Sequence, residues 1–473
     1  LVARRVAAAL SGTPGVLLAG PPRSGKTALA RRLAQQGTPV LALDDAATLA
    51  AARTDPAGFV RGLDRVVIDE VHRAPELLPA ILESADADPR PGRFLLTGSA
   101  DVATVPRVEG SLAGPLEVVR LLPLAQAEIR GVGPTFLARA FNGEVPTVGA
   151  PAVGDDLVAL VLAGGYPEAL RRPSRARRDW FLDHAMAVVQ RGVRDVAQVE
   201  QPDRMPRLLE VLARHAGRLA NHSAIGAALG MNHVTTQRYV GILEQLFLVT
   251  TLPPWRASGL KRLAKTPKLH FLDSGLHAAL LDASPGRVRS NRTLLGPLLE
   301  TFVRAELLKM AGWEDAPCRS SHFRDKEGRE VDIVLEDRRG RVVGVEVKAA
   351  ATVRPSDFGG LRRLAEACGD RFALGMVLHD SHGAVPFGER LHAVPISALW
   401  GGGHSADSAG AVTTARATEP FRSGHCRPRP AAPPPPPVAG GALPHPSTPS
   451  PRRRGAKASS VTAVMPLETA TSS

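Results

Sequence analysis

The fold of the first part of this chain is decided by the sequence Val16-Leu17-Leu18-Ala19-Gly20-Pro21-Pro22-Arg23-Ser24-Gly25-Lys26-Thr27. An apolar run ends in a glycine-bounded loop, and a helical pattern follows from Ala28 to Ala34. A G-x-x-x-x-G-K-T segment between a strand and a helix is typical of a phosphate-binding loop. Its glycines let backbone N–H groups turn toward a nucleotide phosphate at the helix N-terminus. The sequence therefore predicts an ATP site.

Two side chains of this loop have predicted roles. Lys26 supplies a positive charge to the β- and γ-phosphates, and the Thr27 hydroxyl is a ligand for Mg²⁺. The nucleotide-binding residues predicted from the loop are Gly20, Pro21, Pro22, Arg23, Ser24, Gly25, Lys26 and Thr27. The alternative is a glycine-rich strand-to-helix turn that binds nothing.

Short apolar segments alternate with helical patterns through residues 1–131, which predicts an α/β domain with a mainly parallel sheet. The expected strands are Val16–Ala19, Val40–Leu43, Val66–Ile68, Phe94–Thr97 and Leu116–Leu121. Asp44 and Asp45 follow the second of these, and we interpret them as caps of the next helix.

Two acidic residues, Asp69 and Glu70, end the third expected strand. Ligands of open α/β sheets bind at the C-terminal ends of the strands. Asp69 therefore suits the Mg²⁺ shell, and Glu70 is placed to orient or deprotonate the water that attacks the γ-phosphate. Thr97, or alternatively Ser99, is a candidate γ-phosphate contact on the neighbouring strand, although the same residues also suit a simple turn.

The composition favours a multidomain protein with an anionic partner. The chain has 473 residues, a formal net charge of +13 and three cysteines, Cys318, Cys368 and Cys426, which lack metal-site or disulfide spacing. A basic chain favours a polyanion such as DNA. No segment has the length of a membrane span, and no signal peptide is visible, so we expect a cytoplasmic protein without a membrane partner.

Several motifs of the first domain resemble those of a prokaryotic AAA-type P-loop ATPase family. They are Gly20–Thr27, Ile68–Leu78, Leu95–Ser99 and Ser111-Leu112-Ala113-Gly114. Members of that family carry a C-terminal domain of unknown function with a restriction-endonuclease-like core, and the resemblance covers about residues 1–400. The family usually places an arginine after Ser-Leu-Ala-Gly, where this chain has Pro115. If that arginine contacts the γ-phosphate, Arg120 is a candidate substitute.

The middle of the chain is expected to form a linker over residues 132–156, a helical segment over 157–205 and a winged helix-turn-helix over 206–290. The helical segment includes the Gly164-Gly165-Tyr166-Pro167 signature of the family. In the winged helix we expect helices at Pro206–Ala216, Ala224–Leu229, capped by Ser223, and His233–Leu246.

Two parts of this winged helix carry groups suited to DNA. Thr235, Thr236, Gln237 and Arg238 lie in the N-terminal half of the third helix, where a recognition helix meets base edges. The expected wing between two strands holds Arg256, Lys261, Arg262, Lys265 and Lys268, which suit phosphate contact. The alternative is a protein-docking module.

Residues 291–400 resemble the PD-(D/E)XK nuclease core. Asp332 and then Glu346-Val347-Lys348 follow its spacing, and period two places Glu346 and Lys348 on one strand face. If the hairpin centres near Arg339, Asp332 lies opposite Glu346. Both carboxylates would then bind a divalent ion, Lys348 would steady the attacking hydroxide, and Glu300 would complete the site as in related nucleases. Glu300 pairing with Arg304 is the structural alternative.

Residues 401–473 form a proline- and arginine-rich segment that we expect to be a disordered tail, or the product of translation past a frameshift. The predicted function is that of an ATP-hydrolysing, DNA-associated protein with a nuclease-like module. The alternative is a nucleotide-dependent switch that binds DNA or a protein and cleaves nothing. The sequence leaves open whether the chain forms a homo-oligomer.

Overall fold

The computed structural model describes residues 1–34, 36–99, 115–195, 201–255, 266–313 and 318–404, and for residues 193–195, 403 and 404 only the backbone. Contacts between Cα atoms group residues 1–411 into one compact unit. All described residues belong to this unit. No described helix is both long and apolar enough to cross a membrane.

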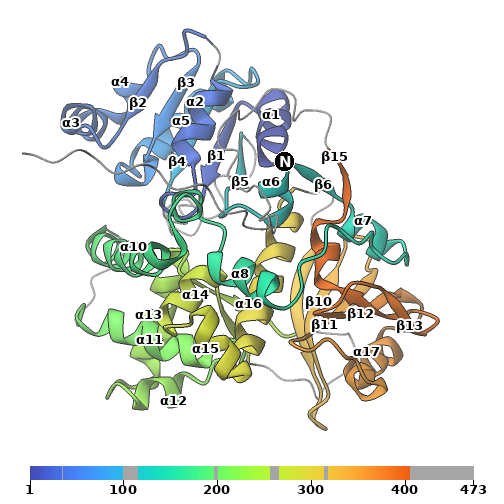
Figure 1. Ribbon diagram of the computed structural model, residues 1–473. Coiled ribbons are helices and arrows are strands. Elements are labelled where there is room, and N and C mark those ends of the chain that lie inside the picture. Colours follow the sequence, from blue (N-terminus) through green and yellow to red (C-terminus); the bar gives the residue numbers. More distant parts are fainter. Residues whose placement is uncertain (35, 100–114, 196–200, 256–265, 314–317, 405–473) are drawn as a thin grey trace, which may run out of the picture. The chain divides into compact units, whose positions relative to one another are not determined.

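A five-stranded parallel sheet forms the first part of the chain, as predicted (Figure 1). Its order is β2-β3-β4-β1-β5, and neighbouring strands are parallel throughout. The strands are β1 (Gly15–Ala19), β2 (Val40–Ala42), β3 (Val66–Asp69), β4 (Phe94–Gly98) and β5 (Leu116–Arg120). They lie within two residues of the expected segments, because short apolar runs between turn residues mark buried parallel strands clearly.

Helices cover both faces of this sheet. The helices are α1 (Val2–Gly12), α2 (Lys26–Leu33), α3 (Ala46–Thr54), α4 (Pro56–Val60) and α5 (Leu77–Ala87). Leu17 packs in a core with residues of α3, α4 and α5, whereas Val16 and Leu18 pack with residues of α1 and α2. The alternation of β1 side chains between the two cores follows from the strand period of two. Asp45 caps α3 by accepting a hydrogen bond from the Thr48 amide, as expected.

Residues 132–156 were expected to be a linker, and this prediction was wrong. They contain β6 (Val132–Pro134) and α7 (Phe136–Phe141), and Phe136 and Leu137 are buried in a large core. β6 pairs with β15 (Gly402–His404), which lies inside the predicted unstructured tail. The glycines and prolines of these segments indicated a loop because they weaken the local pattern, but the pairing partner is about 270 residues away and has no local sequence signal.

Most of the middle of the chain is helical, and it includes a two-stranded antiparallel sheet. Its elements are α6 (Gln126–Arg130), α8 (Asp155–Ala163), α9 (Pro167–Leu170), α10 (Ser174–Asp195), α11 (Arg204–His215), α12 (His222–Ala227), α13 (His233–Gln245), β7 (Val249–Leu252), β8 (Lys268–Phe271), α14 (Ser274–Leu280) and α15 (Pro285–Ser290). The cap of α12 is Asn221, which accepts a hydrogen bond from the Ala224 amide, rather than Ser223 as expected. β7 and β8 are antiparallel, and the expected wing residues 256–265 between them lie outside the described part of the chain.

The last region is a six-stranded mixed sheet of order β13-β14-β12-β11-β10-β9. Its elements are α16 (Leu295–Ala311), β9 (Arg319–Arg324), β10 (Glu330–Glu336), β11 (Val342–Lys348), α17 (Gly359–Cys368), β12 (Phe372–His379), β13 (Val385–Gly388) and β14 (Leu391–Pro395). Leu299 and Val303 of α16 share a core with one side of the sheet, and Leu361 and Leu364 of α17 share a core with the other. The sheet is therefore covered on both faces.

The Gly164-Gly165-Tyr166-Pro167 signature joins α8 to α9 at a crowded turn. Gly164 has a φ of 65°, and a Cβ there would lie 2.2 Å from Oδ1 of Asp273. The Gly165 amide donates to Oδ2 of Asp273 at 2.8 Å, and the Gly165 carbonyl accepts from the Leu124 amide at 2.8 Å. Both glycines are thus needed because two other segments approach the backbone closely.

Replacing Gly165 with alanine is expected to destabilise the fold by about 1–3 kcal/mol, the range for a forced steric clash in a packed interior. The added Cβ would lie 2.2 Å from the backbone oxygen of Leu124, which cannot rotate away as a side chain can. Urea unfolding measures the loss. Gly286→Ala in α15 is the matched control, because a Cβ there meets nothing within 4 Å, and an equal loss in both variants would contradict this account.

Candidate functional site

The loop between β1 and α2 has the shape expected of a phosphate-binding loop. Gly25, with a φ of 101°, precedes the first residue of α2. A Cβ on Gly20 would lie 2.1 Å from the Leu121 carbonyl oxygen, so no other residue fits there without a shift of the backbone. The loop therefore requires both of its glycines, one for a left-handed conformation and one for a close approach.

The polar side chains of the loop are buried and turned inward. Lys26 is 4% exposed, and its Nζ donates to the carbonyl oxygens of Gly20 at 3.0 Å and Pro21 at 2.9 Å. Burial lowers the pKa of Lys26 to about 8, against the opposing charges of Glu70 and Asp69. The Ser24 Oγ is also buried and has no hydrogen-bond partner in the described structure. A buried ammonium, an unpartnered hydroxyl and a curled backbone fit a polyphosphate.

Thr27 and Asp69 are brought together from α2 and β3. The Thr27 Oγ1 donates to both carboxylate oxygens of Asp69, each at 3.0 Å. The Thr97 Oγ1 at the end of β4 donates to the same carboxylate and accepts from the Glu70 amide at 3.0 Å. A hydroxyl beside a carboxylate fits a Mg²⁺ site. Thr97 contacts Asp69, so it positions that side chain in this structure.

Glu70 lies directly after Asp69 and has a φ of 60°, in the left-handed region that non-glycine residues rarely adopt. Ser99 Oγ donates to it at 2.8 Å, and His72 Nδ1 lies 3.1 Å from its Oε2. Burial alone would raise the pKa of Glu70, but the His72 hydrogen bond and the Lys26 charge, with Ser99, lower it to about 2. Glu70 is therefore ionised at neutral pH. The sequence analysis did not identify His72, because only the fold brings its ring against Glu70.

A cavity of about 440 Å³ lies beside Glu70 and the tip of the phosphate-binding loop, whereas Lys26, Thr27 and Asp69 are not among the residues that line it. Pro22, Arg23, Glu70, His72 and Ser99 line one side of it. The other side consists of His184, Val188 and Arg191 of α10 and Leu246, the residue after α13. Arg23 also bridges the two sides, because its Nη1 lies 3.2 Å from Glu168 Oε2 and its guanidinium lies 6.0 Å from the Trp180 ring centroid. A ligand here would thus contact both the loops at the end of the five-stranded sheet and the helical region.

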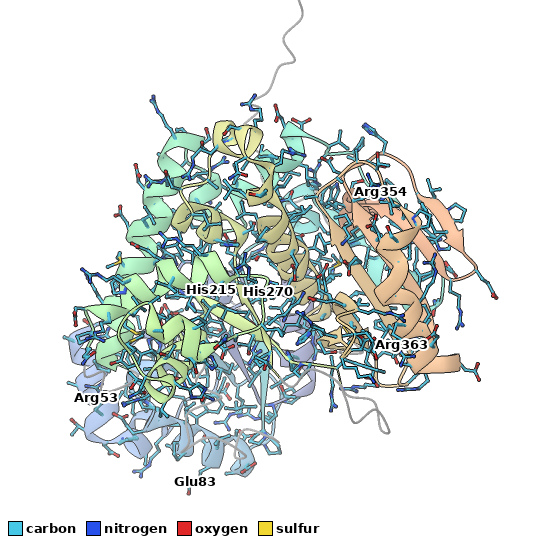
Figure 2. The ribbon with its side chains drawn as sticks, turned by 90° about the horizontal axis from the view of Figure 1, so that it is seen from below. Arg53, Glu83, His215, His270, Arg354 and Arg363 are labelled. Carbon is cyan, nitrogen blue, oxygen red and sulfur yellow. The ribbon has the colours of Figure 1, made fainter. Side chains whose placement is uncertain are left out.

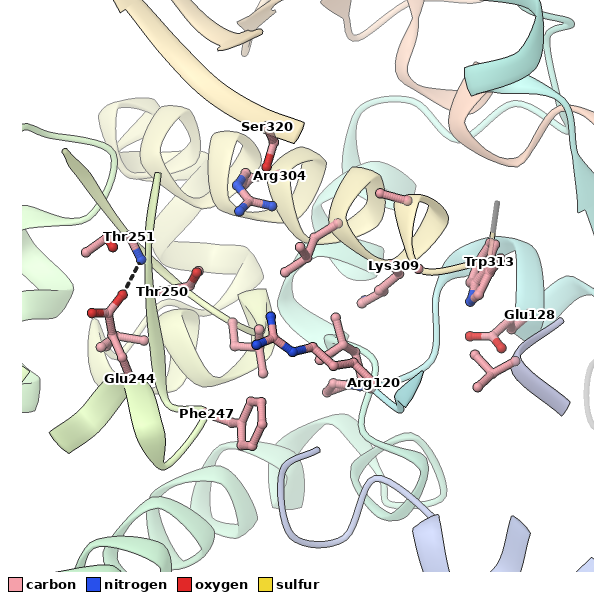
Figure 3. Close-up of a pocket in the computed structure, with 18 of the residues that line it drawn as sticks. Arg120, Glu128, Glu244, Phe247, Thr250, Thr251, Arg304, Lys309, Trp313 and Ser320 are labelled. Atoms are coloured by element: carbon pink, nitrogen blue, oxygen red, sulfur yellow. Dashed lines mark hydrogen bonds between the residues drawn. The ribbon is translucent and has the colours of Figure 1, made fainter. Parts of the chain in front are cut away.

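Arg120, the candidate substitute for the arginine of the family, does not line this cavity. It pairs with Ala19 at the end of β5 and projects into a different cavity of about 490 Å³, with Phe247, Arg304 and Trp313 (Figure 3). Arg120 therefore does not take the role of the family arginine at the phosphate-binding loop of its own chain. The Ser111–Gly114 motif lies outside the described residues, whereas Pro115 immediately precedes β5.

The nuclease-like residues of the C-terminal sheet have the register that the sequence analysis predicted. Ile333 pairs with Val345, so Asp332 and Glu346 are opposite at the next position. The Asp332 amide lies 3.4 Å from Glu346 Oε2, and Asp332 Oδ2 accepts from the Val347 amide at 2.9 Å. Lys348 Nζ lies 2.7 Å from Glu346 Oε1. Burial, and next the charge of Asp332, raise the pKa of both Glu300 and Glu346.

Lys268, expected to be a solvent-facing wing residue, is instead 2% exposed. Its Nζ lies 3.0 Å from Glu300 Oε1 and 2.9 Å from Asp332 Oδ1, and it also forms an ion pair with Glu330. We call Glu300, Glu330, Asp332 and Glu346 the carboxylate cluster. His270, two residues after Lys268 on β8, is also buried, among the packed side chains of this region (Figure 2).

A divalent ion at Asp332 and Glu346, as the nuclease resemblance implies, does not fit the cluster in this arrangement. Lys268 already donates to the oxygens of Asp332 and Glu300 that would bind such an ion. In the described part of the chain, no group of three or more His, Cys, Asp or Glu side chains is arranged to hold a metal ion. The alternative pairing of Glu300 with Arg304 is not seen either, because Glu300 pairs with Lys268.

The third helix of the expected winged helix, α13, presents only part of its predicted recognition surface. Gln237 and Arg238 are exposed, and the Val234 side chain is 73% exposed. Thr236, in contrast, is buried and donates to the Asn232 carbonyl oxygen at 2.8 Å. A Cβ on Gly226 of α12 would lie 2.4 Å from the Thr236 Oγ1, so α12 and α13 pack closely against each other at this point.

Comparison with known proteins identifies the first domain. A family model described as an AAA domain matches residues 13–130, and two models described as domains of unknown function, DUF8612 and DUF4143, match residues 154–287 and 295–399. The uncharacterized proteins Rv2008c of Mycobacterium tuberculosis and Mb2031c of Mycobacterium bovis are each 30% identical over 358 residues, which are 74% of this chain and 74% of each relative. The chain belongs to the family of these proteins, and its AAA domain indicates a nucleotide-dependent ATPase.

Among solved structures, the chain is similar to the Walker-type ATPase PABY2304 of Pyrococcus abyssi, with 16% identity and a TM-score of 0.36 over 59% of this chain and 94% of that one. RuvB T158V of Thermotoga maritima has 20% identity and a TM-score of 0.27, over 53% of this chain and 89% of that one.

Proposed function

We propose that this protein is a Mg²⁺-dependent ATPase whose nucleotide state controls how a DNA-binding helical module is presented, and that it acts as a switch without cutting DNA. The observation that carries this proposal is the cavity of about 440 Å³ shared by the phosphate-binding loop, Glu70 and α10. A nucleotide there contacts the helical region directly, so binding and release change the contacts that hold this region.

Each residue of the site has a role in this proposal. The loop amides and Lys26 bind the phosphates, while Thr27 and Asp69 hold the Mg²⁺ ion, which supplies positive charge to the phosphate oxygens when it is bound. Glu70 orients the attacking water through a carboxylate that Ser99 and His72 hold in place. Thr97 positions Asp69.

The path from the cavity to the DNA-binding surface runs through α10 and α13. A Cβ on Gly192 of α10 would lie 2.1 Å from a Leu246 side-chain carbon, so the helix and the residue after α13 are in close contact at the wall of the cavity. The exposed Gln237 and Arg238 lie on α13 itself. Movement of α10 is therefore transmitted to the helix that we propose to contact DNA.

DNA association is expected to depend on the basic segment between β7 and β8. Lys261→Ala/Arg262→Ala should weaken binding to any DNA duplex and reduce the slope of log affinity against log salt by about 2, because two phosphate contacts are lost. Fluorescence anisotropy over a salt series, with a non-hydrolysable ATP analogue and separately with ADP, measures both the slope and the effect of the nucleotide.

The control for this experiment is Arg31→Ala/Arg32→Ala, which removes the same charge from exposed positions of α2. We expect the control to leave the slope unchanged. Equal slopes in wild type and Lys261→Ala/Arg262→Ala would exclude the basic segment as a DNA contact. DNA affinities that are equal with the ATP analogue and with ADP would contradict the switch.

A further inference from the structure

The carboxylate cluster contains a cation that belongs to the chain itself. Glu300 comes from α16, and Glu330 and Asp332 come from β10, whereas Lys268 comes from β8 of the two-stranded sheet. The Lys268 ammonium has three donors, and three carboxylates surround it. The ligands of a divalent ion in such a site are these same carboxylate oxygens.

Lys268 is placed by the backbone. β8 pairs with β7, and residue 268 also forms a bridge with Leu219. The next residue, Leu269, donates to the Arg218 carbonyl oxygen at 2.9 Å, and its own carbonyl accepts from Gly217 at 2.8 Å. The backbone of β8 is thus fixed on both sides, and the Lys268 side chain is 2% exposed, so it has no open path to water while β8 is in place.

The other cations near the cluster do not take this position. Lys348 is paired with Glu346 at 2.7 Å and is 35% exposed, and Arg324 lies 3.4 Å from the outer oxygen of Glu330 with a side chain that is 41% exposed. Burial, together with the charges of Arg304 and Lys268, lowers the pKa of His270, so that this ring is neutral. Among the described residues, Lys268 is thus the buried charge that balances Glu300 and Asp332.

We propose that Lys268 is a built-in counter-ion that occupies the position of a divalent cation, so that the nuclease-like module is free of metal whenever β8 is docked. A buried acidic cluster without a cation is strongly unfavourable, and either an ammonium or a metal ion satisfies it. The two are therefore mutually exclusive. The module gains a metal site only if Lys268 withdraws, and this makes the two-stranded sheet an autoinhibitory element.

The test is binding of Mn²⁺ in the absence of nucleotide, measured on the full chain by electron paramagnetic resonance of free Mn²⁺. Wild type and Asp332→Asn are expected to bind the same amount, because the cluster is closed to metal in both. Lys268→Met is expected to bind about one additional equivalent, since the vacated carboxylates then need a cation. Lys268→Met/Asp332→Asn should lose that additional equivalent.

A second variant covers the case in which Lys268→Met fails to fold because its carboxylates repel. Lys268→Met/Glu330→Gln removes one carboxylate together with the lysine and keeps Glu300, Asp332 and Glu346. This variant should gain the Mn²⁺ equivalent and show a rise in melting temperature with Mn²⁺ that wild type lacks. The proposal is overturned if wild type binds Mn²⁺ in a manner sensitive to Asp332→Asn. It is also overturned if neither Lys268 variant gains a site.

Discussion

Replacing Glu70 with glutamine is expected to slow ATP hydrolysis by about 100-fold or more while ATP binding stays nearly unchanged. The substitution keeps the size of the side chain and its ability to accept a hydrogen bond from Ser99, but it removes the negative charge. An amide cannot take a proton from water, and it polarises water less than a carboxylate does. The loss therefore falls on turnover and spares the phosphate contacts.

The structure explains why Glu70 suits this role. Its backbone is in the left-handed region, and such strained residues cluster at sites where the side chain must point in one direction. The pKa of about 2 keeps the carboxylate ionised at neutral pH. Ser99, the residue after β4, and His72, in the turn after β3, hold its two oxygens, so contacts within the chain fix the direction of the Glu70 carboxylate.

The measurement is steady-state phosphate release together with ATP binding by titration calorimetry. Glu76→Gln is the matched control, because it makes the same chemical change at a half-exposed carboxylate that pairs with Arg53. We expect that control to retain full turnover. Hydrolysis by Glu70→Gln at the wild-type rate would remove Glu70 from the catalytic role.

The parts of the fold and site that the sequence predicted are those whose signals are local. The phosphate-binding loop, the strand that leads into it and the acidic end of β3 are each determined within about a dozen residues, because their chemistry requires particular residue types at short spacing. The Asp332–Glu346 register was predictable for the same reason, since a short hairpin fixes the pairing once its turn is known.

Contacts between distant segments could not be predicted. Lys268 was grouped with the basic residues around it, because nothing in its neighbourhood indicates that Glu300 and Asp332 will surround it. The Gly164-Gly165 turn was recognised as a family motif, but the sequence did not explain why glycine is needed there. The explanation is the close approach of Asp273 and Leu124 to this backbone. His72 is three residues from Asp69 in sequence, but its function depends on the left-handed turn at Glu70.

Replacing Lys26 with alanine is expected to weaken ATP binding by about 100-fold or more, because a charge-assisted contact with two phosphates is lost. In this structure the ammonium donates to the carbonyls of Gly20 and Pro21, and burial lowers its pKa, so the lysine is held in the loop at a cost in solvation. A polyphosphate offers it stronger acceptors. The unliganded fold does not need this charge, so its melting temperature should change little.

The melting temperature with and without ATP separates loss of binding from loss of folding. At an ATP concentration about 100 times the wild-type Kd, binding stabilises wild type by about 2.7 kcal/mol. A variant whose Kd is 100-fold higher gains only about 0.4 kcal/mol at the same concentration. Lys326→Ala, which removes an exposed lysine paired with Glu327, should behave as wild type. If ATP raises the melting temperature of Lys26→Ala as much as that of the control, the nucleotide binds elsewhere. The reason is that the loop has no other buried cation that could replace the Lys26 ammonium at the phosphates.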